Sequence, residues 1–328
     1  IDGQKHIHHC QKYKQICLPM KINNKSQIEK PFSDGCAFID GNYTAIDEAK
    51  IPILDWGFIR SDATYDVVSS WKGKFFRLDA HLERFRNSLE RLNLQLPISE
   101  KEMINILANC TYKAGLQDAY VEMICTRGQP KWGSRDPRKC QNAFYAFAVP
   151  YVWIATPEQQ EEGLNLHISD KQRISPMSVD PTVKNYHWLD LDTALIDALE
   201  TGHDTVLLTD SEGNLCEGPG FNIFVVNNNK ISTPRYGVLE GITRKTVIDM
   251  AAELELELSE CNVSKNQIEA ADEVFISTTA GGVIAITKVD KKIVGTGKPG
   301  KITKLLSETY WSWHENAKYT TPILDLVS

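Results

Sequence analysis

The stretch Leu239-Glu-Gly-Ile-Thr-Arg244 leads into apolar residues at helical spacing, which predict a helix from Ile242 to Leu254. The first N–H groups of a helix have no partner within it, so the amides of Ile242 and Thr243 are placed to bind an anion such as a phosphate. A glycine turn followed by ordinary helix capping is the alternative interpretation of this stretch by itself.

Two other segments have the composition of an anion-binding site. Ser277-Thr-Thr-Ala-Gly-Gly282 follows a predicted buried strand and combines hydroxyl groups with glycines whose amides are exposed. His81-Leu-Glu-Arg84 begins a predicted helix, on which Arg84 can offer a forked pair of donors to a phosphate. A plain turn and a solvated helix face are the alternatives. The sequence contains no Walker loop and no dinucleotide-binding fingerprint, which disfavours nucleotide hydrolysis and hydride transfer.

Lys184 and Glu217 are the side chains best placed for covalent or acid–base chemistry. Lys184 follows an apolar residue and precedes a predicted helix from about Trp188 to Leu199, where burial favours a reactive amine. Glu217 sets one carboxylate among small residues at the entry to an apolar strand, within Cys216-Glu-Gly-Pro-Gly-Phe-Asn222. An exposed lysine and a turn glutamate are the ordinary alternatives.

The composition excludes several classes of partner. The chain has 328 residues, enough for two domains, and its 36 Lys and Arg against 43 Asp and Glu leave a net charge of −7. This balance disfavours binding to a phosphate polymer. The longest apolar stretch, from Phe144 to Ala155, contains Pro150 and is shorter than the roughly 20 residues of a membrane-spanning helix. We therefore expect a globular protein whose partner is neither a nucleic acid nor a membrane.

The start of the chain and its cysteines predict a cytoplasmic location. Residues 1–14 carry charge and three histidines where a secretory signal needs an apolar core. The eight cysteines contain no CxxC pair, so we interpret them as reduced thiols. His6, His8 and His9 are close together, but a terminal segment favours adventitious metal contact over a built site. The sequence therefore predicts no metal site.

The alternation of apolar residues indicates two domains of overall α+β class with mixed sheets. Two hairpins, at Cys36–Ile46 and Tyr65–Leu78, precede two helices and two buried strands that flank a polar loop at 128–142. A polar segment near mid-chain indicates a linker. The predicted divisions are an N-terminal extension at 1–35, a small α/β domain at 36–152, a linker at 153–162 and a large domain at 163–328.

Six motifs, taken together and in chain order, resemble those of the class IV aminotransferases, which are pyridoxal-phosphate enzymes of fold type IV. The resemblance runs from about Ala37 to Trp313. It implies a small N-terminal α/β domain and a larger cofactor-binding domain with mixed sheets or a pseudo-barrel. The motifs are Tyr65-Asp-Val67, His81-Leu-Glu-Arg84, Val183-Lys-Asn185, Glu217-Gly-Pro-Gly-Phe-Asn222, Gly241-Ile-Thr-Arg244 and Thr278-Thr-Ala-Gly-Gly282.

The resemblance also implies roles for the site residues. Lys184 is implied to bind pyridoxal 5'-phosphate covalently and to move the proton between substrate and cofactor carbons. Glu217 is implied to pair with the pyridine nitrogen. The other implied cofactor contacts are Arg84, Gly241, Ile242, Thr243, Thr278 and Thr279 around the phosphate and Leu239 against the ring. The implied substrate pocket includes Tyr65, Tyr120, Trp188 and Ala280.

Within the family, Arg60-Ser-Asp-Ala-Thr-Tyr-Asp66 and Lys184-Asn-Tyr-His-Trp188 are most similar to the (R)-selective amine transaminases. The predicted function is transfer of an amino group from an (R)-configured primary amine to a 2-keto acid such as pyruvate, by a ping-pong mechanism. A branched-chain or D-amino-acid aminotransferase is the main alternative, aminodeoxychorismate lyase a further one. A cofactor-binding protein that has lost turnover, or a non-enzymatic scaffold, is the alternative from another class. The resemblance implies a homodimer with active sites at the subunit interface.

Three residues or segments depart from the family pattern, one near the cofactor ring and two on the substrate side of the site. Pro219 replaces a small residue, Arg60 replaces a histidine of amine transaminases, and Trp132-Gly-Ser134 replaces the Arg-x-His pair of D-amino-acid enzymes. We hypothesise that Arg60, Arg135 or Arg138 binds the carboxylate of the keto acid. A loop arginine can fold in for an acid and out for a neutral amine. Surface charges are the alternative interpretation of these arginines.

Overall fold

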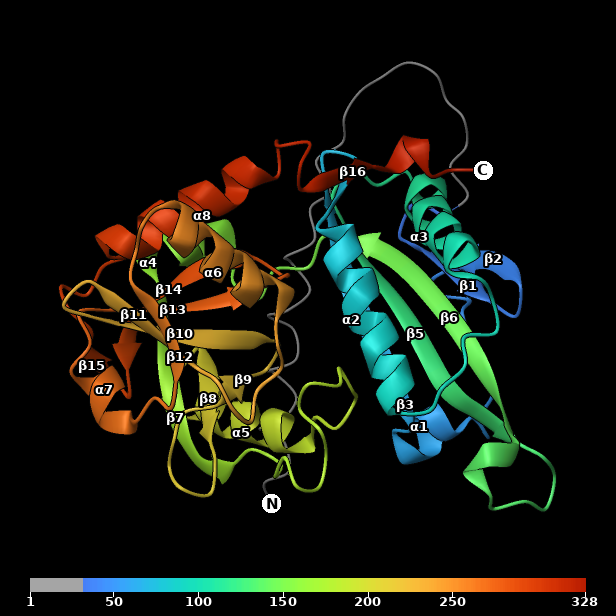
Figure 1. Cartoon of the computed structure of the whole chain (residues 1–328), viewed down its shortest axis with the longest axis horizontal. Coiled ribbons are helices and arrows are strands. Elements are labelled where there is room, and N and C mark those ends of the chain that lie inside the picture. Colours follow the sequence, from blue (N-terminus) through green and yellow to red (C-terminus); the bar gives the residue numbers. More distant parts are fainter. Residues whose placement is uncertain (1–31) are drawn as a thin grey trace, which may run out of the picture. The chain divides into compact units, whose positions relative to one another are not determined.

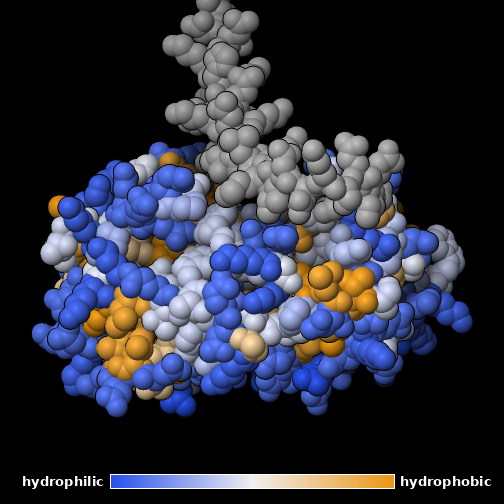
Figure 2. Space-filling model, turned by 90° about the horizontal axis from the view of Figure 1, so that it is seen from above, coloured by the Kyte–Doolittle hydropathy of each residue, from blue (hydrophilic) through white to orange (hydrophobic). Residues whose placement is uncertain are grey.

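The structure, a computed structural model, describes residues 32–328, which form two sheets with helices packed on them (Figure 1). Most of the predicted N-terminal extension, including His6, His8 and His9, lies outside the described residues. Among residues 32–328, none of the helices combines the length and apolar character that a membrane span requires. On the face shown in Figure 2, hydrophilic residues prevail and hydrophobic residues form separate patches.

In the described residues, seven strands form an antiparallel sheet in the order β16-β4-β3-β5-β6-β1-β2. The two predicted hairpins are confirmed. One turns at Asp40 and Gly41 and the other at Lys72 and Gly73, all with positive φ, as the twist of a tight hairpin requires. The strands are β1 (Cys36–Ile39), β2 (Asn42–Ala45), β3 (Ala63–Trp71), β4 (Lys74–Phe76), β5 (Ala119–Pro130), β6 (Cys140–Pro150) and β16 (Thr320–Pro322).

Two helices pack on this sheet, α2 (Leu78–Arg91) and α3 (Glu100–Ala114), as the apolar spacing predicts. Phe85 and Leu107 are fully buried and share one core with Val68 of β3. Each such side chain contributes about 1.5–3 kcal/mol through burial. The core thereby fixes the direction in which α2 projects its polar residues.

In the described residues, nine strands form a second, mixed sheet along the order β12-β11-β10-β13-β14-β7-β8, with β15 on β14 and β9 on β10. The amide of Cys216, next to β9, donates to Leu208 of β8, so β8 lies beside the segment that pairs with β10. The strands are β7 (Leu164–Gln172), β8 (Thr205–Thr209), β9 (Glu217–Gly218), β10 (Phe221–Asn227), β11 (Lys230–Pro234), β12 (Leu258–Cys261), β13 (Glu273–Thr278), β14 (Gly282–Val289) and β15 (Lys292–Ile293).

Helices pack on the second sheet through two apolar cores. Phe224 and Phe275 are stacked in one core together with residues of α6 and α8. Ala194 of α5 packs with Val206 of β8 in the other. The helices are α4 (Pro157–Glu162), α5 (Leu189–Glu200), α6 (Ile242–Glu253), α7 (Lys265–Glu269) and α8 (Lys301–Trp313).

The predicted polar loop at 128–142 is shorter in the structure, because β5 continues to Pro130 and β6 begins at Cys140. The pairing resumes after a register shift between Thr126 and Gln129, where Gly128 has a φ of 72°. Main-chain pairing continues the hairpin past the register shift, and this pairing does not depend on apolar side chains, so the polar sequence did not reveal it. A 3-10 helix (Pro137–Lys139) lies in the remaining loop.

The predicted linker at 153–162 contains the helix α4, whose start is closed by a reciprocal pair of hydrogen bonds between Thr156 and Gln159. The short helix α1 (Trp56–Arg60) was also not predicted. Strand β16, near the end of the chain, pairs with β4 of the first sheet. The division into domains stays a prediction.

We expect Gly128→Ala to lower the free energy of unfolding by about 1–3 kcal/mol more than Gly133→Ala, measured by urea denaturation. Both glycines have positive φ, so the conformational cost of alanine is shared. A Cβ atom at Gly128 lies 1.8 Å from the Gln141 carbonyl oxygen, whereas one at Gly133 meets nothing within 4 Å. Equal losses of stability in the two variants would contradict the close approach of Gly128 to Gln141 at the register shift.

Candidate active site

Lys184 lies on the segment between β7 and α5, where strand β3 of the other sheet holds its main chain. The carbonyl oxygen of Lys184 accepts hydrogen bonds from the Thr64 hydroxyl at 2.7 Å and from the Tyr65 amide at 3.2 Å. The Nζ atom lies 4.3 Å from the centroid of the Tyr65 ring. The lysine is therefore fixed at its backbone, while its amine faces an aromatic ring.

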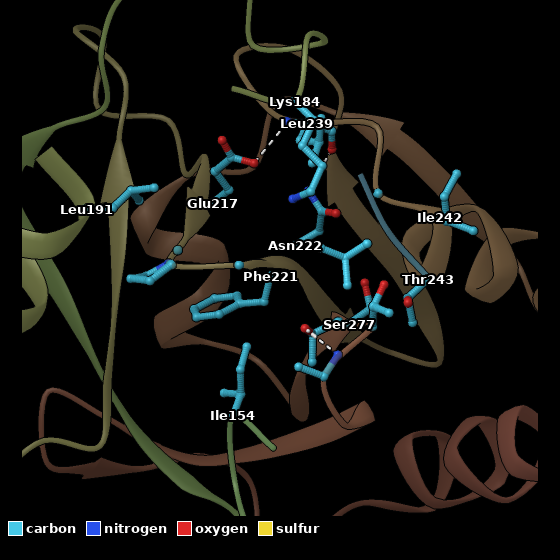
Figure 3. Close-up of a pocket in the computed structure, with 18 of the residues that line it drawn as sticks. Ile154, Lys184, Leu191, Glu217, Phe221, Asn222, Leu239, Ile242, Thr243 and Ser277 are labelled. Atoms are coloured by element: carbon cyan, nitrogen blue, oxygen red, sulfur yellow. Dashed lines mark hydrogen bonds between the residues drawn. The ribbon is translucent and has the colours of Figure 1, made fainter. Parts of the chain in front are cut away.

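Glu217 lies on β9 with its carboxylate buried, and both oxygens accept hydrogen bonds. Arg173 donates to Oε1 at 3.1 Å, and the Leu239 amide donates to Oε2 at 2.9 Å (Figure 3). Arg173 also donates to Asp190 at 2.7 Å. Burial raises the pKa of Glu217, and the positive charge of Arg173 acts against that rise. The carboxylate is thereby held in one orientation.

Arg84 projects from α2 and is oriented by the buried carboxylate of Asp66 on β3. Its Nε and Nη2 atoms donate to the two oxygens of Asp66 at 2.7 and 2.8 Å, and Nη1 donates to the Glu240 carbonyl at 3.2 Å. His81 Nδ1 lies 2.7 Å from the same carboxylate. Although burial acts to raise the pKa of Asp66, the charge of Arg84 and the bond from His81 hold it well below its usual range. Arg84 is thus a fixed cation beside the start of α6.

The predicted helix start is confirmed, since α6 begins at Ile242 after Gly241, which has no side chain to cap it. The first-turn amides are therefore available to a ligand. A Cβ atom at Gly241 would lie 2.2 Å from Asn222 Oδ1, so a larger residue does not fit. The Asn222 side chain also donates to the Leu239 carbonyl at 2.9 Å and so shapes the turn before the helix.

The turn after β13 supplies hydroxyl groups to the same pocket. The Thr278 hydroxyl accepts a hydrogen bond from the Ala280 amide at 3.1 Å, which shapes this turn. The Ser277 hydroxyl is buried and has no hydrogen-bond partner within residues 32–328. A buried hydroxyl without a partner costs free energy, so it suits a ligand that carries hydrogen-bonding oxygens.

These groups line one cavity of about 370 Å³, a volume within the range of cofactor and small-molecule sites. Figure 3 shows the labelled side chains of Lys184, Glu217 and Thr243 around it. The structure brings together residues that the sequence places far apart. The predicted site residues that line the cavity are Tyr65, Arg84, Tyr120, Lys184, Trp188, Glu217, Leu239, Gly241, Ile242, Thr243, Thr278, Thr279 and Ala280.

The three arginines predicted to bind a keto-acid carboxylate do not line this cavity within the described chain. The Arg60 guanidinium carbon lies 3.4 Å from the centroid of the Trp56 ring. Arg135 is exposed, and Arg138 pairs with Asp136 on the surface. Their role in substrate binding stays a prediction. Pro219 lines the cavity beside Glu217.

Sequence reasoning missed the acid Glu122, which is buried beside the aromatic residues Tyr65, Tyr120 and Tyr186, called the aromatic wall below. Tyr120 donates to Oε2 at 3.2 Å and Tyr186 donates to Oε1 at 2.6 Å. Burial raises the pKa of Glu122, and the two phenol groups act against that rise. The ring of Tyr186 stacks on Tyr65, with centroids 4.3 Å apart. The alternation of side chains along β5 places Glu122 on the same face as Tyr120, a signal that could have identified it.

Sequence reasoning also missed Arg173 and Asp66. Both orient a predicted site residue, Arg173 by pairing with Glu217 and Asp66 by pairing with Arg84. Asp66 stands in the motif around Tyr65, so its position was visible, but its partner was not. For Arg173 no local pattern indicates a role, because its partners are on β9 and α5.

Comparison with known proteins identifies the family. A family model described as "Amino-transferase class IV" matches residues 63–289. The chain is 30% identical over 276 residues to a putative branched-chain-amino-acid aminotransferase of Methanocaldococcus jannaschii, with 83% of this chain and 94% of the relative covered. It is 31% identical over 280 residues to a probable branched-chain-amino-acid aminotransferase of Rickettsia typhi, with 83% and 94% covered. The chain belongs to the class IV aminotransferases, as its motifs predict.

Solved structures support the same fold. The branched-chain aminotransferase of Thermoproteus uzoniensis with norvaline has a TM-score of 0.80 at 26% identity, covering 88% of this chain and 99% of that one. The T.th. branched-chain amino acid aminotransferase with pyridoxamine 5'-phosphate has a TM-score of 0.82 at 25% identity, covering 89% and 99%. The predicted fold type IV is confirmed. These relatives do not support the predicted (R)-amine subtype.

The protein is therefore an aminotransferase that uses pyridoxal phosphate, the cofactor of its family. The residues of the cavity fit this cofactor. The buried Ser277 hydroxyl without a partner and the close approach at Gly241 both mark the end of the cavity where donors gather. A lysine amine and a buried carboxylate line the same cavity, as covalent attachment and pairing with a ring nitrogen require.

We expect Asp66→Asn to lower the free energy of unfolding by about 3–5 kcal/mol near neutral pH, because it leaves the Arg84 charge unpaired. The native pKa of Asp66 lies below the unfolded value of about 3.9, so the stabilisation is complete above about pH 5 and is lost as the pH falls below about 4. Denaturant unfolding of both proteins across this pH range measures the difference. Asp136→Asn, which alters an exposed pair, serves as the control, with little change at any pH. A difference that does not narrow at low pH would contradict this account.

Proposed function

We propose that the protein transfers an amino group between a branched or other hydrophobic amino acid and a 2-keto acid. The observation that carries this proposal is the meeting of Lys184, Glu217 and the start of α6 in one cavity. The names of the relatives, branched-chain aminotransferases, support the substrate class. Apolar residues of the cavity suit a hydrophobic side chain, namely Val152, Ile154, Trp188, Leu191 and Leu195.

In this proposal Lys184 would hold the cofactor covalently, and its amine would then move a proton to and from the substrate carbon. Bound pyridoxal phosphate supplies an electron-withdrawing ring that stabilises negative charge on the substrate carbon. Glu217 pairs with the ring nitrogen and keeps it protonated. Arg84, the amides of Ile242 and Thr243, and the hydroxyl groups of Thr243, Thr278 and Thr279 hold the phosphate, while Leu239 packs on the ring. The first product leaves before the second substrate binds, which makes the mechanism ping-pong.

A second candidate is transfer from an (R)-configured primary amine, and the buried carboxylate of Glu122 favours it. A phenol has one hydrogen, and that of Tyr120 is donated to Glu122. A substrate carboxylate next to Tyr120 therefore meets a phenol oxygen that can only accept, with the Glu122 carboxylate behind it. The arginines that line the cavity are already paired, Arg84 with Asp66 and Arg173 with Glu217 and Asp190. An amine without a carboxylate avoids this mismatch.

Assays with L-leucine, D-alanine, both enantiomers of 1-phenylethylamine, and aminodeoxychorismate, each with pyruvate or 2-oxoglutarate, test the proposal. We expect the highest kcat/KM with L-leucine. A preference for (R)-1-phenylethylamine would support the second candidate. Turnover of D-alanine would indicate a D-amino-acid aminotransferase, and turnover of aminodeoxychorismate would indicate aminodeoxychorismate lyase. Lys184→Ala is the control and is expected to lose all transfer, because it removes the amine. Activity retained in this variant would refute the proposed site.

Glu122→Gln tests whether the Glu122 carboxylate influences substrate choice, because the substitution removes its negative charge and keeps the shape of the side chain. If an amine is the natural substrate, the ratio of the KM for leucine to the KM for 1-phenylethylamine is expected to be roughly tenfold lower in the variant than in the wild type. A tenfold change corresponds to about 1.4 kcal/mol of binding free energy. Because burial raises the pKa of Glu122, the discrimination of the wild type weakens as the pH is lowered through that pKa, whereas the variant shows no such dependence. An unchanged ratio of KM values would exclude Glu122 from substrate choice.

We also propose a cytoplasmic homodimer whose active sites lie at the subunit interface, as the family resemblance implies. Large apolar side chains of the segment around α1 support a covered surface. Ile53, Leu54, Phe58 and Ile59 are all exposed in the single chain, with Ile53 at 74%. In such a dimer Arg60, Arg135 or Arg138 of one subunit would bind the keto-acid carboxylate in the active site of the other subunit.

A further inference from the structure

Three residues outside the active site meet at one end of the second sheet. His167 lies on β7, His203 lies just before β8, and Asp290 directly follows β14. Strand β7 pairs with both β8 and β14, so the three segments are neighbours (Figure 1). Each residue offers one nitrogen or carboxylate oxygen, and these three atoms lie within 4.8 Å of one another.

The hydrogen bonds around His203 favour the tautomer in which its Nδ1 atom carries the proton. Its Nδ1 atom lies 3.0 Å from the Thr201 hydroxyl oxygen. That hydroxyl has one hydrogen, which it donates to the main-chain carbonyls of Asp197 and Ala198 at 2.9 and 3.0 Å. With its hydrogen directed to these carbonyls, the Thr201 oxygen is the acceptor towards His203, and Nδ1 is then the nitrogen that carries the proton. In this tautomer the Nε2 atom is left with a free lone pair.

This lone pair is buried. His203 is 8% exposed, and its Nε2 atom has no hydrogen-bond partner in the described part of the chain. A buried polar atom without a partner costs free energy unless a ligand or a water satisfies it. The His167 ring lies next to it, with ring centroids 4.9 Å apart. The lone pair is thus placed beside two further metal-binding groups.

His167 and Asp290 share a proton that a metal can replace. His167 Nδ1 lies 2.8 Å from Asp290 Oδ1, and since the carboxylate only accepts, the nitrogen is the donor. The Ile168 amide donates to the same oxygen at 3.1 Å and fixes the carboxylate. Metal ligands in proteins are commonly oriented by such outer hydrogen bonds. Binding of a cation between the imidazole and the carboxylate releases the shared proton to solvent.

We propose that His167, His203 and Asp290 form a binding site for a divalent transition metal such as Zn²⁺. Two imidazole nitrogens and one carboxylate oxygen suit zinc, cobalt or nickel better than calcium or magnesium, which prefer oxygen ligands. Water completes the coordination, because His167 and Asp290 are partly exposed. The metal joins β7, the loop before β8 and the turn after β14, and it stabilises the native fold by mass action.

The site is distinct from the active site. His167, His203 and Asp290 do not line the cavity, and His167 precedes the cavity residue Arg173 by six positions along the chain. The proposal differs from the sequence-based prediction of no metal site. His167 and Asp290 are 123 positions apart in the chain, so no local spacing indicates the cluster.

Calorimetric titration of the full-length holoenzyme with ZnCl₂ tests the proposal. The chain carries His6→Ala, His8→Ala and His9→Ala, so that the terminal histidines do not contribute. We expect one Zn²⁺ per chain, with a Co²⁺ absorption spectrum typical of nitrogen and oxygen ligands. Zn²⁺ is also expected to raise the melting temperature without changing the cofactor absorbance.

Substitutions in the same background decide whether the cluster is the ligand set. His167→Gln and Asp290→Asn, at partly exposed positions, are each expected to weaken Zn²⁺ binding at least tenfold, and His203→Ala is expected to abolish it. Asp204→Asn, a carboxylate of the same loop outside the cluster, is the matched control and is expected to keep the affinity. Absence of binding in the background chain, or equal affinity in all variants, would overturn the proposal.

Discussion

The carbonyl oxygen of Lys184 accepts hydrogen bonds from Thr64 and Tyr65, and this contact sets the first sheet against the segment that carries the reactive amine. The rest of the cavity is arranged around it. The aromatic wall and Arg84 come from the first sheet and its helix, whereas Glu217 and the start of α6 come from the second. Because the anchoring bonds use only the main chain of the lysine, its position is fixed while its side chain remains available for chemistry.

A second constraint is that the ions of the cavity are largely buried and therefore need partners. Asp66 balances Arg84, and Arg173 lies between Glu217 and Asp190. Such pairs add little net stability, since the attraction mainly offsets the loss of hydration. Their effect is on orientation, because each charged side chain is held by two or more hydrogen bonds. The cavity thus offers a fixed cation beside free helix amides in one part and a fixed carboxylate in another.

Proton positions are determined by neighbours in two separate places. The phenol hydrogen of Tyr120 is committed to Glu122, which leaves an acidic surface behind the substrate wall. The hydroxyl hydrogen of Thr201 is committed to helix carbonyls, which leaves a free lone pair on His203. In both places a hydroxyl has a single hydrogen, so once that hydrogen is donated elsewhere the hydroxyl oxygen can only accept.

The sequence by itself determined the hairpins, most helices and the motifs around Lys184, Glu217 and the start of α6, because each depends on residues within a few positions of one another. Helix starts, tight turns and apolar periodicity are local properties of this kind. The pairing of Arg173 with Glu217 joins residues 44 positions apart, and that of His167 with Asp290 joins residues 123 apart. Only the tertiary structure decided these contacts, since strand order and register determine which distant side chains meet.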